Sequence, residues 1–355
     1  MTSKNYSLRP INIILTAAGC PGASTIIRYL QKIKERKIKI IGVDSNLESI
    51  GRFLADAFEV VPNADDPLYI DTLVNICIKY NIDCILVSSS YEVEHIAANV
   101  DYFKKNNVKA LVSSLDSLKI ANNKHLLYET FKDDPDVNVP KFILVNNLDD
   151  FIKGCELLGY PDKKLCFKPP ISKGSRGFRY IDSEVNRADL LLNYKPDTPR
   201  ISLNEVIEIF KNEKIFPELL LMETVQGEEI DSMILALEGD PLLITHKTRE
   251  AERGGVITLG GHAERELITG QIRAILRKIK LSYNVGIQFK GGYLMEINPR
   301  LSTFLYNNEW NEPYTAIKLA LGEISKEDVK SLQSRVPLNL RMIRYFDQYF
   351  YETDN

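Results

Sequence analysis

The sequence predicts an α/β domain with a parallel sheet, followed by an α+β region of antiparallel strands. In the first 115 or so residues, short apolar runs alternate with helical patterns, which is typical of a parallel sheet covered on both faces. Beyond about residue 160 the strand-like runs are separated by short glycine turns, which favours antiparallel pairing. The chain has 355 residues, more than one ordinary core holds, so two or three domains are expected.

The N-terminal elements follow from apolar periodicity. A continuous apolar run predicts each strand, and apolar residues at helical spacing, such as Ile26, Ile27, Leu30 and Ile33, predict each helix. The predicted strands are 11–16, 39–44, 58–61, 84–88 and 110–113, and the predicted helices are 23–36, 71–80 and 92–105.

The later elements are marked by turns and caps. Ser202 and Glu205 form a capping-box pattern that opens a helix. Gln226-Gly227 and Glu238-Gly-Asp-Pro241 separate apolar strands. The predicted strands are 142–145, 178–181, 219–224, 230–237, 242–247, 283–289 and 293–297, and the predicted helices are 148–158 and 264–280. The segment from about residue 317 to 355 is interpreted as a strand-rich tail.

Composition excludes several classes of protein. The 45 basic and 48 acidic residues give a net charge of −3, which argues against a nucleic-acid-binding protein. No apolar run approaches the length of a membrane span, and the polar start lacks a signal-peptide core. The five cysteines are scattered and contain no C-x-x-C pair, so we expect reduced, structural thiols in a cytoplasmic protein.

The most informative segment is the predicted hairpin that ends in Glu296-Ile-Asn-Pro-Arg300. Side chains alternate along a strand, so Glu296 and Asn298 point to one face, and Gln288 on the partner strand could face them. Three oxygen ligands on one face suit a hard cation such as Mg²⁺. Arg300 carries a fork of donors that grips phosphate or carboxylate. The alternative is a satisfied polar cluster at a sheet edge.

A second signal is the segment from Phe167 to Phe178, which contains Lys168, Gly174, Ser175 and Gly177. A strand delivers Lys168, and a loop rich in glycine and basic residues then turns back into a strand. Backbone N–H groups of such a loop can wrap a polyphosphate. The alternative is a solvated basic hairpin.

A third candidate is the turn from Thr16 to Thr25, which follows a strand and opens a helix. Nucleotide phosphates often bind at such a position. The turn is not a good G-x-G-x-x-G, and Asp44 only faintly matches a ribose-binding acid. A dinucleotide site therefore remains the weaker alternative.

Taken together, these motifs resemble the ATP-grasp superfamily, closest to the branch of the carbamoyl-phosphate synthase large subunit. The resemblance extends from about Ile11 to Asn308 and depends on the order of the motifs, of which only Glu-Ile-Asn-Pro-Arg is specific. It implies a Rossmann-like pre-ATP-grasp domain (1–115), then a linker and small lobe of a two-lobed ATP-grasp domain (116–225), then the large lobe and C-terminal tail (226–355).

The resemblance also implies roles for individual residues. Gln288, Glu296 and Asn298 would hold Mg²⁺ (or Mn²⁺) on ATP. Catalytic roles fall to Arg300, Lys247 and Arg249 as cations near the transferred phosphoryl group. The implied ATP-binding residues are Lys124, Lys168, Gly174, Ser175, Gly177, Glu223, Thr224, Val225 and Glu229. The match at Lys124 is partial, because Asn123 replaces the aspartate of the family's "D-K" pair.

The implied reaction joins a small-molecule carboxylate to an amine through an acyl phosphate and releases ADP and phosphate. No nucleic-acid or membrane partner is expected, and a homodimer is one option. Two alternatives stay open: a carbamoyl-phosphate-synthase-like enzyme that uses bicarbonate, and a nucleotide-binding module without catalysis.

Overall fold

The computed structural model of the protein describes residues 7–172, 174, 176–194, 198–302 and 305–353. By its internal contacts the chain divides into two compact units. Unit 1 comprises Met1–Lys119, Glu229–Gln288 and Ile297–Asn355, and unit 2 comprises Ile120–Glu228 and Phe289–Glu296. Each unit is described by itself below.

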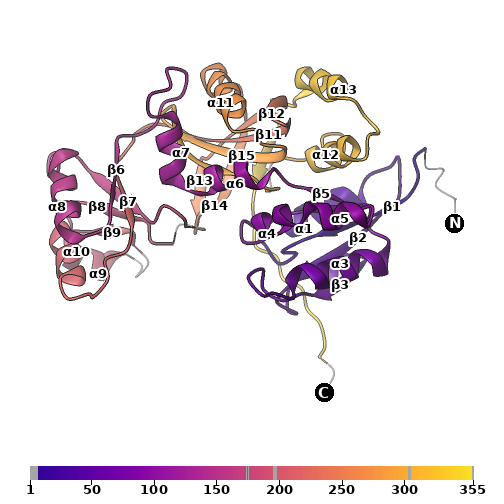
Figure 1. Ribbon diagram of the computed structural model, residues 1–355, viewed down its shortest axis with the longest axis horizontal. Helices are drawn as coiled ribbons and strands as arrows, with labels where there is room; N and C mark the ends of the chain where they lie inside the picture. The colour runs from indigo at the N-terminus through magenta and orange to yellow at the C-terminus, as the bar shows by residue number, and fades with distance from the viewer. Residues whose placement is uncertain (1–6, 173, 175, 195–197, 303–304, 354–355) are drawn as a thin grey trace. The chain divides into compact units, whose positions relative to one another are not determined.

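Unit 1 begins with a parallel sheet in the order β3-β2-β1-β4-β5 (Figure 1). Alternate residues of β1 reach opposite cores: Ile13 and Leu15 pack with α1, whereas Ile14 packs with α3 and α5. The sheet is therefore buried on both faces, as its continuous apolar strands predict. The strands are β1 (Ile11–Leu15), β2 (Ile38–Asp44), β3 (Ala57–Val60), β4 (Cys84–Leu86) and β5 (Lys109–Leu111), and the helices are α1 (Ala23–Gln31), α2 (Gly51–Leu54), α3 (Tyr69–Tyr80), α4 (Val93–Ala98), α5 (Val100–Lys105) and α6 (Leu115–Asn122).

A larger antiparallel sheet has the order β13-β14-β12-β11-β15-β16, with β17 paired to β14. The core that covers one face of the first sheet also includes Met233, Leu243 and Trp310, so the two layers of unit 1 share one apolar interior. The elements are β11 (Glu229–Leu237), β12 (Asp240–Thr248), β13 (Ala251–Arg253), β14 (Val256–Ala263), α11 (Glu266–Lys278), β15 (Tyr283–Lys290), β16 (Tyr293–Asn298), α12 (Glu312–Ala320), α13 (Lys326–Ser331), a 3₁₀ turn (Leu332–Arg335) and β17 (Arg341–Ile343).

Unit 2 is built on a five-stranded sheet in the order β6-β10-β7-β8-β9. Phe151 of α8 and Val206 of α10 pack with Leu221 of β10 in its core. Ser202 and Glu205 form the predicted capping box of α10. The elements are α7 (Lys124–Phe131), β6 (Phe142–Val145), α8 (Leu148–Leu157), β7 (Leu165–Lys168), β8 (Arg179–Ile181), α9 (Arg187–Asn193), β9 (Arg200–Ile201), α10 (Leu203–Phe210) and β10 (Leu219–Glu223).

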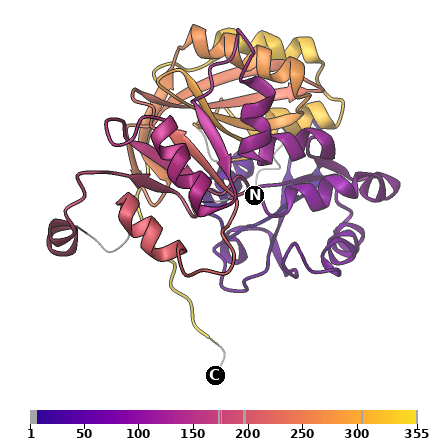
Figure 2. The same ribbon diagram turned by 60° about the vertical axis from the view of Figure 1, so that its left-hand side comes forward.

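The structure corrects three of the predicted elements. The helix expected over 92–105 is two helices, α4 and α5, which meet at Asn99, whose backbone is not helical. The strands β10 and β11, which were expected to form a pair, belong to different sheets. The C-terminal segment is not strand-rich: α12, α13 and the 3₁₀ turn precede one short strand, and the residues after β17 are irregular (Figure 2, yellow).

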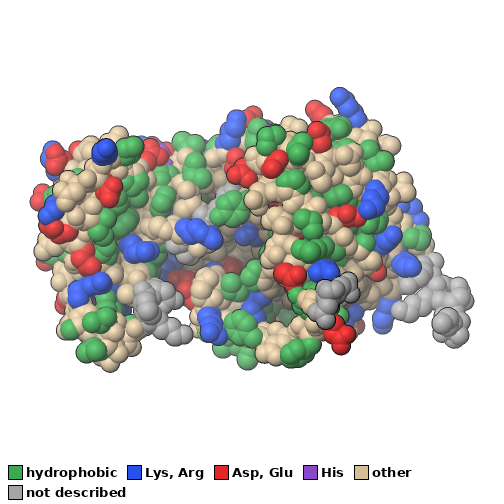
Figure 3. All heavy atoms as spheres, turned by 90° about the horizontal axis from the view of Figure 1, so that it is seen from below, with side chains coloured by type: hydrophobic (Ala, Val, Ile, Leu, Met, Phe, Trp, Pro, Cys, Tyr) green, Lys and Arg blue, Asp and Glu red, His purple; other side chains and the backbone are tan. Residues whose placement is uncertain are grey.

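Three further observations concern the cysteines, the surface charge and the length of the helices. All five cysteines are free thiols. Figure 3 shows acidic and basic side chains interspersed over one face, in keeping with the nearly balanced charge. In the described part of the chain, no helix is both long and apolar enough to cross a membrane.

Candidate functional site

The predicted hairpin forms, and its turn requires glycine. Gly291 and Gly292 join β15 to β16 with φ values of +54° and +83°, the left-handed pair that suits a two-residue hairpin turn. A Cβ on Gly291 would also lie 2.0 Å from the carbonyl oxygen of Gln226. The turn therefore tolerates no side chain at this position.

The three predicted metal ligands share a face of this hairpin. A Cβ on Gly286 would lie 3.5 Å from the Cβ of Asn298, so these two residues face the same side. Gln288 is two residues beyond Gly286 on β15, and Glu296 is two residues before Asn298 on β16. Because strand side chains alternate, Gln288, Glu296 and Asn298 project from the same side.

A cavity of about 220 Å³ in unit 1 collects most of the predicted catalytic residues. Lys247, Arg249 and Arg300 line it, together with Gln288 and Asn298. The wall is also formed by residues that sequence reasoning did not assign to the site, namely Cys20, Pro21, Ser88, Asp231, Ser302 and Arg344. Segments far apart in the chain, from Cys20 to Arg344, thus contribute to one cavity.

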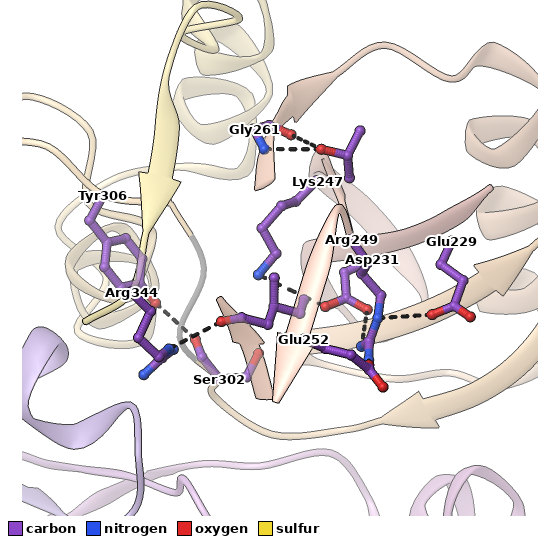
Figure 4. A network of polar contacts seen from close by, with 11 residues as sticks. Glu229, Asp231, Lys247, Arg249, Glu252, Gly261, Ser302, Tyr306 and Arg344 are labelled. Carbon is purple, nitrogen blue, oxygen red and sulfur yellow. Dashed lines mark hydrogen bonds and ion pairs between the residues drawn. The ribbon is translucent and has the colours of Figure 1, made fainter. Parts of the chain in front are cut away.

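Two of the predicted cations are held by carboxylates (Figure 4). The Nζ of Lys247 lies 3.8 Å from Asp231, and the guanidinium of Arg249 lies 3.3 Å from Asp231, 3.2 Å from Glu229 and 2.5 Å from Glu252. Burial, with the nearby charges of Arg249 and Arg344, lowers the pKa of Lys247 to about 8 despite Asp231. Asp231 therefore orients both cations, a role that its position in the sequence did not reveal.

Arg300 is fixed at the end of the hairpin. Its Nε donates to Ser90 Oγ at 2.7 Å, and its Nη1 donates to the carbonyl oxygen of Leu301 at 3.2 Å. The backbone N–H of Leu301 in turn donates to Val87, just beyond β4. The hairpin end is thus tied to the carboxyl end of the parallel sheet, where ligands bind in α/β folds.

In unit 2, the structure brings together Lys124, Lys168 and Glu296. Lys124 begins α7, which Asn123 caps by accepting from the N–H groups of His125 and Leu126. Its Nζ lies 3.6 Å from Glu296 and donates to the carbonyl oxygen of Ser172 at 3.1 Å. Asparagine in place of the family's aspartate therefore still serves as a helix cap.

Lys168 is a cation in an unfavourable environment. Its side chain is buried at the end of β7, with Nζ 5.8 Å from the centre of the Tyr128 ring. Burial and then the charge of Lys124 lower its pKa to about 8, although Glu296 opposes the shift. Two lysines near one carboxylate leave the cluster with an excess of positive charge, which an anion would offset.

The predicted phosphate loop is described only in part. Gly174 and Gly177 adopt left-handed φ values of +62° and +76°. A Cβ on Gly177 would lie 2.6 Å from the ring of Pro169. Ser175, predicted to bind ATP, lies outside the described residues.

Two of the residues predicted to bind ATP, Glu223 and Thr224, already have hydrogen-bonded backbone N–H groups. The N–H groups of Glu223 and Thr224 donate to the carbonyls of Lys141 and Lys164, and the Glu223 carboxylate accepts from the N–H of Lys141. A nucleotide base that binds at this segment would therefore have to form hydrogen bonds with the backbone of Val225 or with backbone carbonyl groups. Glu229, which was also predicted to bind ATP, pairs with Arg249.

The turn after β1 is occupied by its own contacts. Asp44 Oδ2 accepts from the N–H of Gly19 at 2.8 Å, and its Oδ1 accepts from Asn46. A Cβ on Gly19 would lie 2.5 Å from Ser49 Oγ. Asp44 is thus engaged within the turn, which weakens the case for a dinucleotide site there.

Arg344 is a pocket residue that sequence analysis missed. It directly follows β17 in the C-terminal segment, and its Nε donates to Ile257 at 3.1 Å while its Nη1 donates to Pro21 at 2.6 Å. The sequence itself shows only two basic residues, Arg341 and Arg344, three positions apart in the C-terminal segment. Nothing local separates the one that lines the cavity from the one that does not.

Two family models match the chain. One, described as "PylC-like, N-terminal domain", covers residues 13–111, and the other, described as "ATP-grasp in the biosynthetic pathway with Ter operon", covers residues 215–342. A search of curated proteins finds no match.

Solved structures share the fold. N5-carboxyaminoimidazole synthetase from Staphylococcus aureus has a TM-score of 0.61 at 15% identity, over 88% of this chain and 78% of that chain. The biotin carboxylase domain of Hydrogenobacter thermophilus 2-oxoglutarate carboxylase was solved with MgADP, ADP and bicarbonate. It has a TM-score of 0.60 at 16% identity, over 88% of this chain and 70% of that chain. Campylobacter jejuni biotin carboxylase has a TM-score of 0.60 at 16% identity, over 90% of this chain and 72% of that chain. These likenesses confirm the predicted fold class.

Proposed function

We propose that the chain is an ATP-dependent carboxylate–amine ligase, a proposal supported by the match of residues 215–342 to an ATP-grasp family model. The observation that carries the proposal is the cluster of Lys124 and Lys168 in unit 2, where a buried lysine with a depressed pKa lies near a second lysine. A polyphosphate is the ligand class that such a cluster favours, because it supplies several negative charges to a dry site.

The residues on the hairpin fit Mg²⁺. Two amide oxygens and one carboxylate are hard donors on one face, and Mg²⁺ takes few protein ligands while it shares phosphate oxygens and water. Among the described residues, no group of three or more His, Cys, Asp or Glu side chains is placed to hold a metal ion. The proposed ligand set contains only one residue of those types, Glu296, so it would not register as such a group. We propose that Gln288, Glu296 and Asn298 hold the ion, which neutralises phosphate charge when bound.

In the proposed reaction, an oxygen of the substrate carboxylate attacks the γ-phosphorus of ATP. The bond from that phosphorus to the ADP oxygen breaks, leaving an acyl phosphate and ADP. The amine nitrogen then attacks the acyl carbon, phosphate leaves with the bonding electrons, and the amine's surplus proton passes to phosphate or water. Arg300, Lys247 and Arg249 stabilise the negative charge of the transferred group, so catalysis consists of positioning and electrostatics.

The second candidate function uses bicarbonate as the carboxylate. The structure of the 2-oxoglutarate carboxylase domain that shares this fold contains bicarbonate. Bicarbonate would occupy the cavity beside Arg300 and Lys247 and would be phosphorylated in the same way.

We also propose that the chain divides near residues 115 and 225 into the three parts expected from the sequence, and that the protein forms a homodimer.

The experiment that tests the proposal combines binding with turnover. We expect MgATP to raise the melting temperature of the protein and NAD to leave it unchanged. We then expect ADP release from MgATP to depend on one carboxylate and one amine in a screen, with mass spectrometry identifying the product. Stimulation by bicarbonate alone would select the second candidate, and a larger shift with NAD than with MgATP would reject both. MgATP binding without ADP release across the screen would instead support the non-catalytic module.

The depressed pKa of Lys168 predicts a pH dependence of nucleotide binding. Phosphates stabilise the charged lysine, so its pKa is higher in the complex than the value of about 8 in the free protein. Binding above pH 8 therefore takes up a proton, and affinity for MgATP should fall as pH rises through 8, by at most tenfold per pH unit. Below pH 8 this contribution is constant. Calorimetry with MgATP from pH 7 to 9.5 measures this fall in affinity, which should be absent in Lys168→Met.

A further inference from the structure

The four cations that line the unit 1 cavity differ in their partners. Arg249 and Lys247 pair with carboxylates, and Arg300 donates to the Ser90 hydroxyl. Arg344 instead donates to two backbone carbonyls, those of Ile257 and Pro21. In the part of the chain that the structure describes, no carboxylate pairs with Arg344.

The two carbonyls hold Arg344 in place. One carbonyl comes from β14 and the other from the turn between β1 and α1, so the guanidinium is fixed from two directions at the cavity wall. Figure 4 shows Arg344 with a bond drawn as a dashed line. A guanidinium has five N–H donors in a rigid fork, and two bonds leave others to serve a ligand. Its fixed position lowers the entropic cost of gripping an anion.

The charge balance of the cavity points the same way. Of its described lining residues, Lys247, Arg249, Arg300 and Arg344 are basic and Asp231 is acidic. The positive charge of Arg344 reaches Lys247 and helps to lower the pKa of that lysine. Asp231, Glu229 and Glu252 offset much of the charge of Lys247 and Arg249. An anionic ligand would therefore pair best with Arg344, whose partners are carbonyl oxygens.

We propose that Arg344 binds a second anionic group on the acid that the enzyme activates. The substrate acid then carries a reacting carboxylate near Lys247 and Arg300, and a further carboxylate or phosphate at Arg344. This inference rests on the proposed ligase function and narrows its substrate class. Arg344 acts as a specificity determinant that does not touch the reacting carboxylate.

The test measures binding of simple anions to the full-length protein by calorimetry at constant ionic strength, without nucleotide. Succinate and glutarate probe a second carboxylate, phosphonoacetate probes a phosphate-like group, and butyrate is the single-charge reference. We expect the best dianion to bind at least tenfold more tightly than butyrate. A preference for phosphonoacetate over both dicarboxylates would assign the second group as phosphate-like.

Variants test whether Arg344 is the residue that causes the preference for dianions. Arg344→Gln should remove the dianion preference while butyrate affinity stays within about twofold, and Arg344→Lys should recover part of it. Arg341→Gln is the matched control, because Arg341 lies three residues before Arg344, on β17, but pairs with Glu250 at 2.5 Å. It should behave as wild type.

Two results would overturn the inference: equal affinity of the wild-type protein for dianions and butyrate, or equal loss of both in Arg344→Gln. If Arg344→Gln does not fold, the wild-type preference and Arg344→Lys decide the matter. The thermal shift with MgATP is measured in parallel. If MgATP raises the melting temperature of the wild-type protein but that protein shows no preference for dianions, only the role of Arg344 is overturned. If MgATP does not raise the melting temperature of the wild-type protein, the ligase proposal is overturned.

Discussion

Replacement of Glu296 by glutamine should lower ADP formation at least a hundredfold while the protein stays folded. The change keeps the shape of the side chain but removes the one formal charge from the proposed metal ligands, and bound Mg²⁺ stabilises charge in phosphoryl transfer. It also removes the carboxylate 3.6 Å from Lys124, which opposes the low pKa of Lys168. The measurement is the rate of ADP release with the acid and amine identified by the screen.

A comparison of MgATP binding with binding of metal-free ATP distinguishes the loss of a metal ligand from a change in the charge around Lys124 and Lys168. If Glu296 is a ligand, Glu296→Gln should weaken binding of MgATP yet leave binding of metal-free ATP equal or stronger, because the two lysines no longer share their charge with a carboxylate. Glu129→Gln is the control, since Glu129 pairs with Lys132 at 2.7 Å on the surface of α7. Turnover of Glu296→Gln close to that of the wild type would refute the metal assignment.

Replacement of Lys168 by methionine should move nucleotide affinity and stability in opposite directions. Methionine retains the packing volume but cannot pair with phosphate, and a lost charge-assisted hydrogen bond of about 1.5–3 kcal/mol corresponds to a loss of roughly tenfold to a hundredfold in MgATP affinity. The unliganded protein should melt at the same or a higher temperature, because a desolvated cation near Lys124 has been removed.

Lys164→Met controls for a nonspecific loss of positive charge. Lys164 immediately precedes β7, and its side chain is 59% exposed beside Asp182. Calorimetry with MgATP and thermal melting of the free protein report the two effects separately. A Lys168→Met protein that melts lower yet binds MgATP normally would assign Lys168 a structural role and would remove the main support for the polyphosphate site.

Much of the fold was predictable because its signals are local. The apolar runs of β1 and β2 and the Gly291–Gly292 turn each act over a few residues, and all form as predicted. Sheet membership is not local. The segment Gln226–Gly227 resembles a hairpin turn in sequence, yet β10 and β11 belong to separate sheets, since strand pairing is decided by partners distant in the chain.

The helical C-terminal segment shows the same limit. Its aromatic residues and short apolar runs resemble strands, whereas burial against the shared core of unit 1 selects helices there: Tyr314 and Ile317 of α12 and Val329 of α13 pack with Leu243 and Trp310. Tertiary packing overrides weak local preference in such segments.

By itself the sequence determined the strands of the N-terminal sheet, the hairpin with its oxygen-bearing face, and the lysine at the end of β7. Apolar runs, turn geometry and strand alternation require no distant contact. Only the tertiary structure decided which charges meet. It placed Asp231 between Lys247 and Arg249, brought Lys124 to Glu296, and set Arg344 rather than Arg341 at the cavity wall. Electrostatic environment depends on distance and burial in three dimensions, and neither can be read from spacing along the chain.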